Sequence, residues 1–111
     1  MDLQQWCLWY KRRGAGWLRR VLMREWDPIG VADVPEARGE YDGYIGLVGD
    51  RLRRGAPNQE VAALLESIRR DRMGLPAHSE ADSHAAETLR AWYADEMRRW
   101  GSRQVAAENQ R

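Results

Sequence analysis

The stretch EWDPIGV, residues 25–31, forms the corner on which the fold depends. A helical apolar pattern precedes it and meets Pro28, which disfavours the α conformation at Asp27. The Asp27 carboxylate can accept a hydrogen bond from a backbone N–H two or three residues further on, and Gly30 permits a positive φ. We therefore predict that the first main helix ends near Trp26 and that the stretch is a turn, with a partner surface around it, rather than a chemical site.

Helical periodicity governs the rest of the chain. Apolar residues recur at the i, i+3, i+4, i+7 positions within residues 15–26, 40–54, 58–73 and 79–100, and no segment is convincing as a strand. The segment 31–39, which contains Pro35 and Gly39, is long for a loop between helices, and long loops often carry function. The sequence predicts an all-α fold, a compact bundle of four to five helices.

The chain is expected to form one domain with two terminal additions. Residues 15–100 form the helical domain, residues 101–111 a polar C-terminal tail, and residues 1–14 an aromatic and basic extension or helix. Gly14 and Gly16 interrupt the pattern between the first segment and the domain. The first segment could lie on a membrane surface, pack its aromatic side chains on the domain, or stay loosely ordered.

Composition excludes several classes of protein. The 111 residues, 43% of them hydrophobic, suit one domain. The chain has 18 basic and 17 acidic residues. This near-neutral balance argues against general electrostatic binding to nucleic acid or anionic lipid. Cys7 is the only cysteine, so an intrachain disulfide is impossible. No secretory signal or membrane span is recognisable, and we expect a soluble cytoplasmic protein without a cofactor.

The start of the last helix carries the best metal-ligand types. Glu80, His84 and Glu87 would share one helical face, but a metal would need ligands from a second segment. Ser79, with Asp82 three residues on, resembles a capping box. We interpret this region as a solvated helix start with acids near the positive end of the helix dipole, and we expect no metal.

Three glycines recur at every third position of the 40–54 helix: Gly43, Gly46 and Gly49. They lie away from the apolar stripe and leave a smooth strip that another backbone could approach closely. That backbone could belong to a neighbouring helix of the same chain or to a partner, so a homodimer remains open.

Arginines gather at the end of this helix and on the next one. Arg53 and Arg54, with Arg69 and Arg70, could form a basic edge for nucleic acid. Acidic residues are interleaved with them, which favours solvated faces held by salt bridges.

The strings REWDPIGV (24–31), GEYDGYI (39–45) and LLESIRRDRMGL (64–75) resemble a family of small bacterial proteins catalogued as a domain of unknown function. The resemblance covers roughly residues 18–75; it implies a helical bundle and supplies no activity. Similar small proteins are partners of bacterial toxins, which they block with an acidic, aromatic surface. The residues that would form that surface here are Trp26, Asp27, Glu40, Tyr41, Asp42 and Tyr44. The amphipathic stripe favours the alternative that both tyrosines belong to the core.

These observations lead to three hypotheses. The first is a small non-catalytic interaction protein of the toxin-immunity or adaptor type, with an unidentified protein partner. The second is an accessory nucleic-acid-binding protein that uses the arginine edge. The third is a minor enzyme with acidic residues Asp27, Glu40 and Asp42 near the corner, although no pair of acids stands out with a partner base and no residue is assigned as catalytic.

Overall fold

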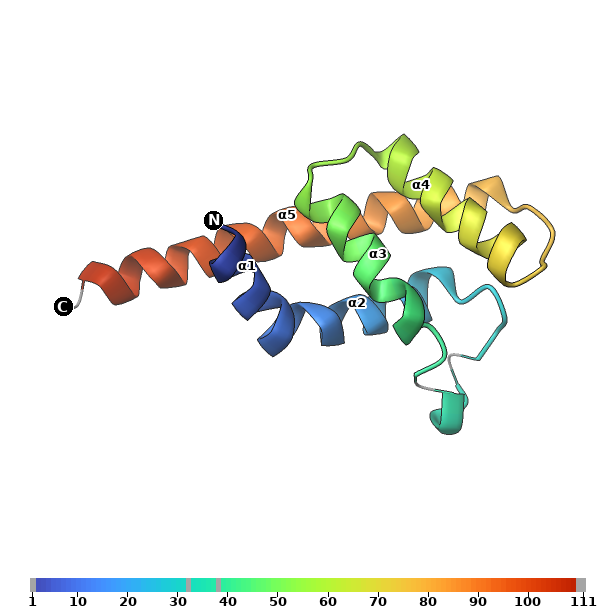
Figure 1. Ribbon diagram of the computed structural model, residues 1–111, viewed down its shortest axis with the longest axis horizontal. Coiled ribbons are helices and arrows are strands. Elements are labelled where there is room, and N and C mark those ends of the chain that lie inside the picture. Colours follow the sequence, from blue (N-terminus) through green and yellow to red (C-terminus); the bar gives the residue numbers. More distant parts are fainter. Residues whose placement is uncertain (1, 32, 38, 110–111) are drawn as a thin grey trace.

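The computed structural model confirms the all-α bundle (Figure 1). It describes residues 2–31, 33–37 and 39–109, with side chains described as far as residue 100, and no strand occurs in those ranges. The α-helices are α1 (Leu3–Trp9), α2 (Ala15–Val21), α3 (Asp42–Arg53), α4 (Asn58–Ser67) and α5 (Ser79–Asn109).

Helices α1 and α2 form one continuous helix. The π-helical turn Tyr10–Gly14 joins them, and a second, Leu22–Trp26, carries α2 to the corner. The expected interruption at Gly14 is therefore wrong. A Cβ atom on Gly14 would lie 2.6 Å from the ring of Trp9. The absence of a side chain at Gly14 therefore leaves space for the buried Trp9 ring, which belongs to the same helix.

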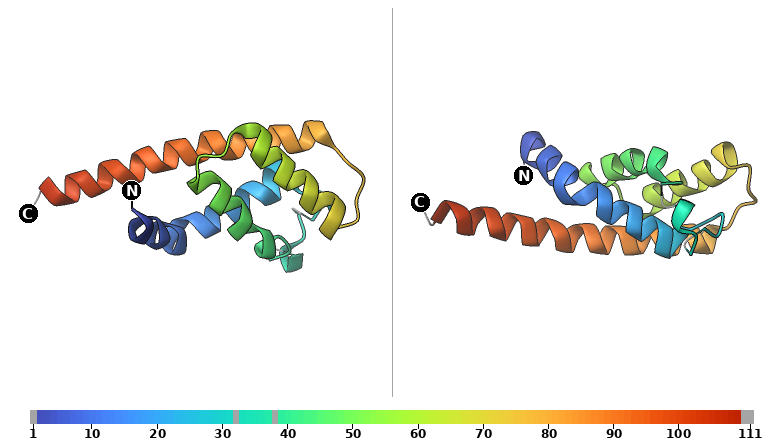
Figure 2. Two further views of the ribbon diagram at one scale, coloured as in Figure 1. Left: turned by 45° about the horizontal axis from the view of Figure 1, so that its top comes forward. Right: turned by 90° about the horizontal axis from the view of Figure 1, so that it is seen from below.

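The N-terminal segment packs on α5, which runs antiparallel to it (Figure 2). Trp6 Nε1 donates a hydrogen bond to Tyr93 Oη at 2.8 Å. Trp9 Nε1, at 3.3 Å, and Arg13 Nε, at 2.7 Å, both donate to Glu96 Oε1. Of the alternatives for the N-terminal segment, the structure shows, over its described residues 2–14, the helix that packs its aromatic side chains on the domain.

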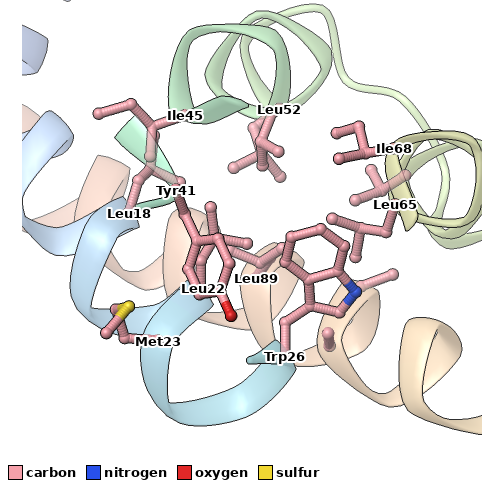
Figure 3. Packing of buried hydrophobic residues seen from close by; sticks show 14 of the residues in the cluster. Leu18, Leu22, Met23, Trp26, Tyr41, Ile45, Leu52, Leu65, Ile68 and Leu89 are labelled. Atoms are coloured by element: carbon pink, nitrogen blue, oxygen red, sulfur yellow. The ribbon is translucent and has the colours of Figure 1, made fainter. Parts of the chain in front are cut away.

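The core lies where α2, α3, α4 and α5 meet (Figure 3). Each helix contributes the apolar stripe that its periodicity predicts, because burial of that stripe is the main source of helix stability in a folded chain. The larger of the fully buried aliphatic side chains are Leu18, Leu22, Val48, Leu52, Val61, Leu65, Ile68 and Leu89. Trp26 and Tyr41 fill the end of this core beside the corner, with ring centroids 5.6 Å apart.

Helix α5 is longer than the sequence indicates. It has 31 residues and reaches Asn109, so the segment expected as a tail from residue 101 is helical; residues 110–111 lie outside the described ones. After Gly101 the sequence holds good helix formers and no proline, which lets the helix continue past the other helices (Figure 1). Within the described residues, no helix is long and apolar enough to cross a membrane.

Candidate functional site

The corner after α2 is held by Asp27 and Tyr41. Asp27 adopts the left-handed conformation, with φ 35°, and the helix ends at Trp26 as predicted. Its Oδ1 atom accepts hydrogen bonds from Tyr41 Oη at 2.6 Å and from the backbone N–H of Val31 at 2.8 Å. The acceptor role of Asp27 is confirmed, but the donor lies four residues on rather than two or three.

Tyr41 is fully buried and remains a hydrogen-bond donor to a carboxylate. Burial, followed by the hydrogen bond to Asp27, raises the pKa of the phenol well above its ordinary value. The backbone N–H of Ile29 completes the arrangement by donating to Tyr41 Oη at 3.3 Å. Asp27 and Tyr41 therefore tie the corner to the start of α3.

A second buried polar cluster joins three segments of the chain. Asp82 Oδ1 accepts hydrogen bonds from Trp26 Nε1 at 2.8 Å and from two nitrogens of Arg69, Nη2 at 2.9 Å and Nε at 3.2 Å. Both charged side chains are almost completely buried. Asp82 is thus a structural ion-pair partner and not part of a capping box. The side chain that caps α5 is His78, whose Nδ1 accepts from the N–H of Ala81 at 3.2 Å.

The six residues predicted as an interaction surface divide between core and surface. Trp26 and Tyr41 are buried, as the apolar stripe favoured, and cannot face a partner. Glu40 and Asp42 are exposed, while Tyr44 is half-buried. Asp42 accepts a bidentate pair of hydrogen bonds from Arg19, at 2.7 and 3.0 Å, which links α3 to α2.

The glycine strip of α3 faces two environments. A Cβ on Gly49 would lie 3.2 Å from Tyr10 and 3.3 Å from Leu18, so this residue meets a neighbouring helix of the same chain. Gly43 has open space around it, and Gly46 approaches only the Tyr10 hydroxyl, at 4.0 Å. The homodimer prediction therefore rests on Gly43 and Gly46 alone, and nothing in the structure tests it.

The exposed arginines of the predicted edge contact acids of the same chain. Arg53 and Arg54 contact Asp50 at 3.1 and 3.0 Å, and Arg70 lies 3.5 Å from Glu66. The prediction that Arg69 belongs to a solvated edge is wrong, because that side chain is buried against Asp82. Its place on the buried face of its helix gives it a partner in the core instead of solvent.

The histidine region matches the interpretation of a solvated helix start. His84 is exposed, and its Nε2 lies 3.3 Å from Glu25 Oε2. Among the described residues, no three histidine, cysteine or acidic side chains are grouped so that they could hold a metal ion.

An open groove of about 680 Å³ lies between α2, with the π-helical turn that follows it, and the loop residues 33–35. It is lined by Gly16, Arg19, Arg20, Met23, Arg24, Asp33, Val34 and Pro35. The loop side includes the 3₁₀ turn Pro35–Ala37, which stands away from the helices in Figure 1. Sequence reasoning marked this loop for its length but missed the arginines opposite it. The available signal was their spacing, since positions 20 and 24 share one face of a helix.

Comparison with protein-family models, curated proteins and solved structures finds no match for the chain. The resemblance of the 24–31, 39–45 and 64–75 strings to a bacterial family stays a prediction.

Proposed function

We propose that this chain is a non-catalytic protein-binding domain of the adaptor or immunity kind, and that it binds its partner through the groove on α2. The groove itself is the observation that supports this proposal. It combines exposed arginine side chains with the apolar surface of Met23, Val34 and Pro35. Arginine and methionine are enriched at protein interfaces relative to the remaining protein surface.

The use of the buried polar groups supports binding over catalysis. A catalytic site needs acids or bases with shifted pKa values that face a cleft where a substrate can bind. Here the carboxylates of Asp27, Asp82 and Glu96 instead accept hydrogen bonds from tryptophan, tyrosine and arginine side chains that hold the helices together. None of these three carboxylates lines the groove, and most of the groove residues are exposed.

The shape and charge of the groove favour a protein over the alternatives. Sites for small molecules are usually enclosed and mostly apolar, whereas this groove is open and rimmed by charge. The arginine edge offered for nucleic acid pairs with Asp50 and Glu66, which lowers its attraction for phosphate.

Site-specific photocrosslinking in the native host tests the proposal. A benzophenone amino acid replaces Val34, which is 43% exposed in the groove, and, as a matched control, Leu47, which is 36% exposed on α3 outside the groove. We expect a discrete protein adduct from the Val34 position, resistant to nuclease and absent from the Leu47 position. Identical adducts from both positions, or none from Val34, would contradict the proposal.

A further inference from the structure

We propose that the groove on α2 binds an acidic segment of the partner, with carboxylates paired to Arg20 and Arg24 and an apolar side chain packed on Met23 and Val34. This inference rests on the proposed function and names the chemistry of the partner. Its basis is that some arginines of the continuous helix formed by α1 and α2 are paired with carboxylates of the chain and others are not.

Two arginines of that helix are already occupied within the chain. Arg13 pairs with the buried Glu96 at 2.7 Å, and Arg19 pairs with Asp42 at 2.7 Å. Arg19 also lines the groove, but its charge is already paired with Asp42 at the start of α3.

Arg20 and Arg24 differ from these two. Neither has a carboxylate within ion-pair distance among the described residues, and both line the groove. The guanidinium of Arg20 lies over the ring of Trp17, 5.4 Å from its centroid. Such stacking orients the planar group before a ligand arrives, so less side-chain entropy is lost when a carboxylate binds.

The apolar part of the groove completes the description of the partner. Met23 is nearly buried and forms the floor, while Val34 is 43% exposed on the loop side. A methionine adapts its shape to different apolar side chains, which suits a surface that receives one residue of a partner. A segment with acidic residues flanking an apolar one therefore complements both parts of the groove.

Acidic residues on the loop side restrict how an anionic partner can bind. Asp33 lines the groove, and the exposed Glu36 and Glu40 follow it along the same segment. A long polyanion such as nucleic acid would be repelled where it crosses this segment. A short acidic segment can keep its carboxylates on the α2 side, so the distribution of charge favours a peptide.

Fluorescence anisotropy with a synthetic peptide tests the inference. The labelled probe carries glutamate pairs on both sides of a leucine; matched probes replace the glutamates with glutamine or the leucine with serine, and a single-stranded DNA has equal charge. The groove variant is Arg20→Glu with Arg24→Glu. Its control, Lys11→Glu with Arg12→Glu, makes the same charge change on the same helix at exposed positions outside the groove.

We expect the groove variant to weaken binding on the order of tenfold or more, and the control variant less than about twofold. Both matched probes, the neutral one with glutamine and the acidic one with serine, should bind more weakly than the probe that carries both glutamate and leucine. Equal weakening by the two variants, DNA binding as tight as peptide binding, or no peptide binding at all would overturn the inference. The crosslink at Val34 is read independently, so a protein adduct there without peptide binding would leave the proposed function standing and remove only the acidic partner.

Discussion

The buried pair of Arg69 and Asp82 gives the sharpest test of how this fold is held together. We consider three variants: Arg69→Met, Asp82→Leu, and both together. Each single change leaves one buried charge without its partner, because both side chains are almost completely inaccessible to solvent. Breaking a buried pair in this way typically costs about 3–5 kcal/mol of the free energy of unfolding.

The double variant should be less destabilised than either single one. It leaves no buried charge, and its main loss is the hydrogen bond from Trp26 Nε1, which donates to Asp82 Oδ1 at 2.8 Å. An unpaired buried donor costs about 1–3 kcal/mol. The second carboxylate oxygen of Asp82 is buried without a hydrogen-bond partner among the described residues. The native pair therefore already carries the cost of one unsatisfied acceptor. Apolar replacements of similar volume remove that desolvation cost as well.

Urea unfolding, followed by far-ultraviolet circular dichroism and by tryptophan fluorescence, measures all four proteins. A domain of this size typically has a free energy of unfolding of about 5–15 kcal/mol. Linear extrapolation to zero urea resolves losses of a few kcal/mol from such a value. The two single costs should greatly exceed the double cost. Single costs below about 1 kcal/mol that add in the double variant would refute the burial argument, because solvated pairs behave in that way.

Three further predictions concern the corner, the glycine strip and the N-terminal helix. Tyr41→Phe should lower the free energy of unfolding by about 1–2 kcal/mol in urea titrations, because it removes the hydroxyl that donates to Asp27. Because the pKa of Tyr41 is raised in the folded protein, its phenol contributes fully to the free energy of unfolding below about pH 10, where the unfolded phenol is also neutral. This contribution is lost as the pH rises further. The free energy of unfolding of the Phe variant should therefore fall less steeply in alkaline solution. Gly43→Ala should stabilise α3 by up to about 1 kcal/mol in thermal unfolding, whereas Gly49→Ala should give no gain or a loss because its Cβ position is crowded; equal gains would contradict the packing. Glu96→Ala should cost about 1–3 kcal/mol and speed amide hydrogen exchange in α1 more than in α4, and unchanged exchange in α1 would show that the buried carboxylate does not hold that helix.

The parts of the fold that follow from local rules could be predicted from the sequence. Pro28 and Gly30 fix the place of the corner through backbone conformation alone, and Gly30 has the positive φ, 68°, that the turn requires. The apolar stripes locate the helices because burial imposes a period of 3.6 residues on each of them. Helix ends are less certain, since α5 continues beyond Trp100 on propensity after its apolar stripe has ended.

The buried charges were missed because a charged residue is ordinarily assigned to solvent. Their helical positions carried the information. Asp82 precedes Ala85, Ala86 and Leu89 by three, four and seven residues, which places it on the buried stripe of α5. Arg69 follows Leu65 by four residues and is buried in the same way. Two opposite charges on the apolar stripes of different helices are therefore a signal for a buried pair, although their pairing depends on tertiary packing.

The arginines of this chain differ in whether an acidic side chain of the same chain balances their charge. Arg69 is buried and paired, so it contributes to the fold. Arg53 and Arg70 are exposed and paired with acids on their own helices, so a partner would have to displace an existing contact. Arg20 and Arg24 are the groove arginines that the described chain leaves without carboxylates, so the proposed partner would not have to break an internal ion pair to contact them. Because net charge is close to neutral, the proposed selectivity rests on which cations remain unpaired and not on how many there are.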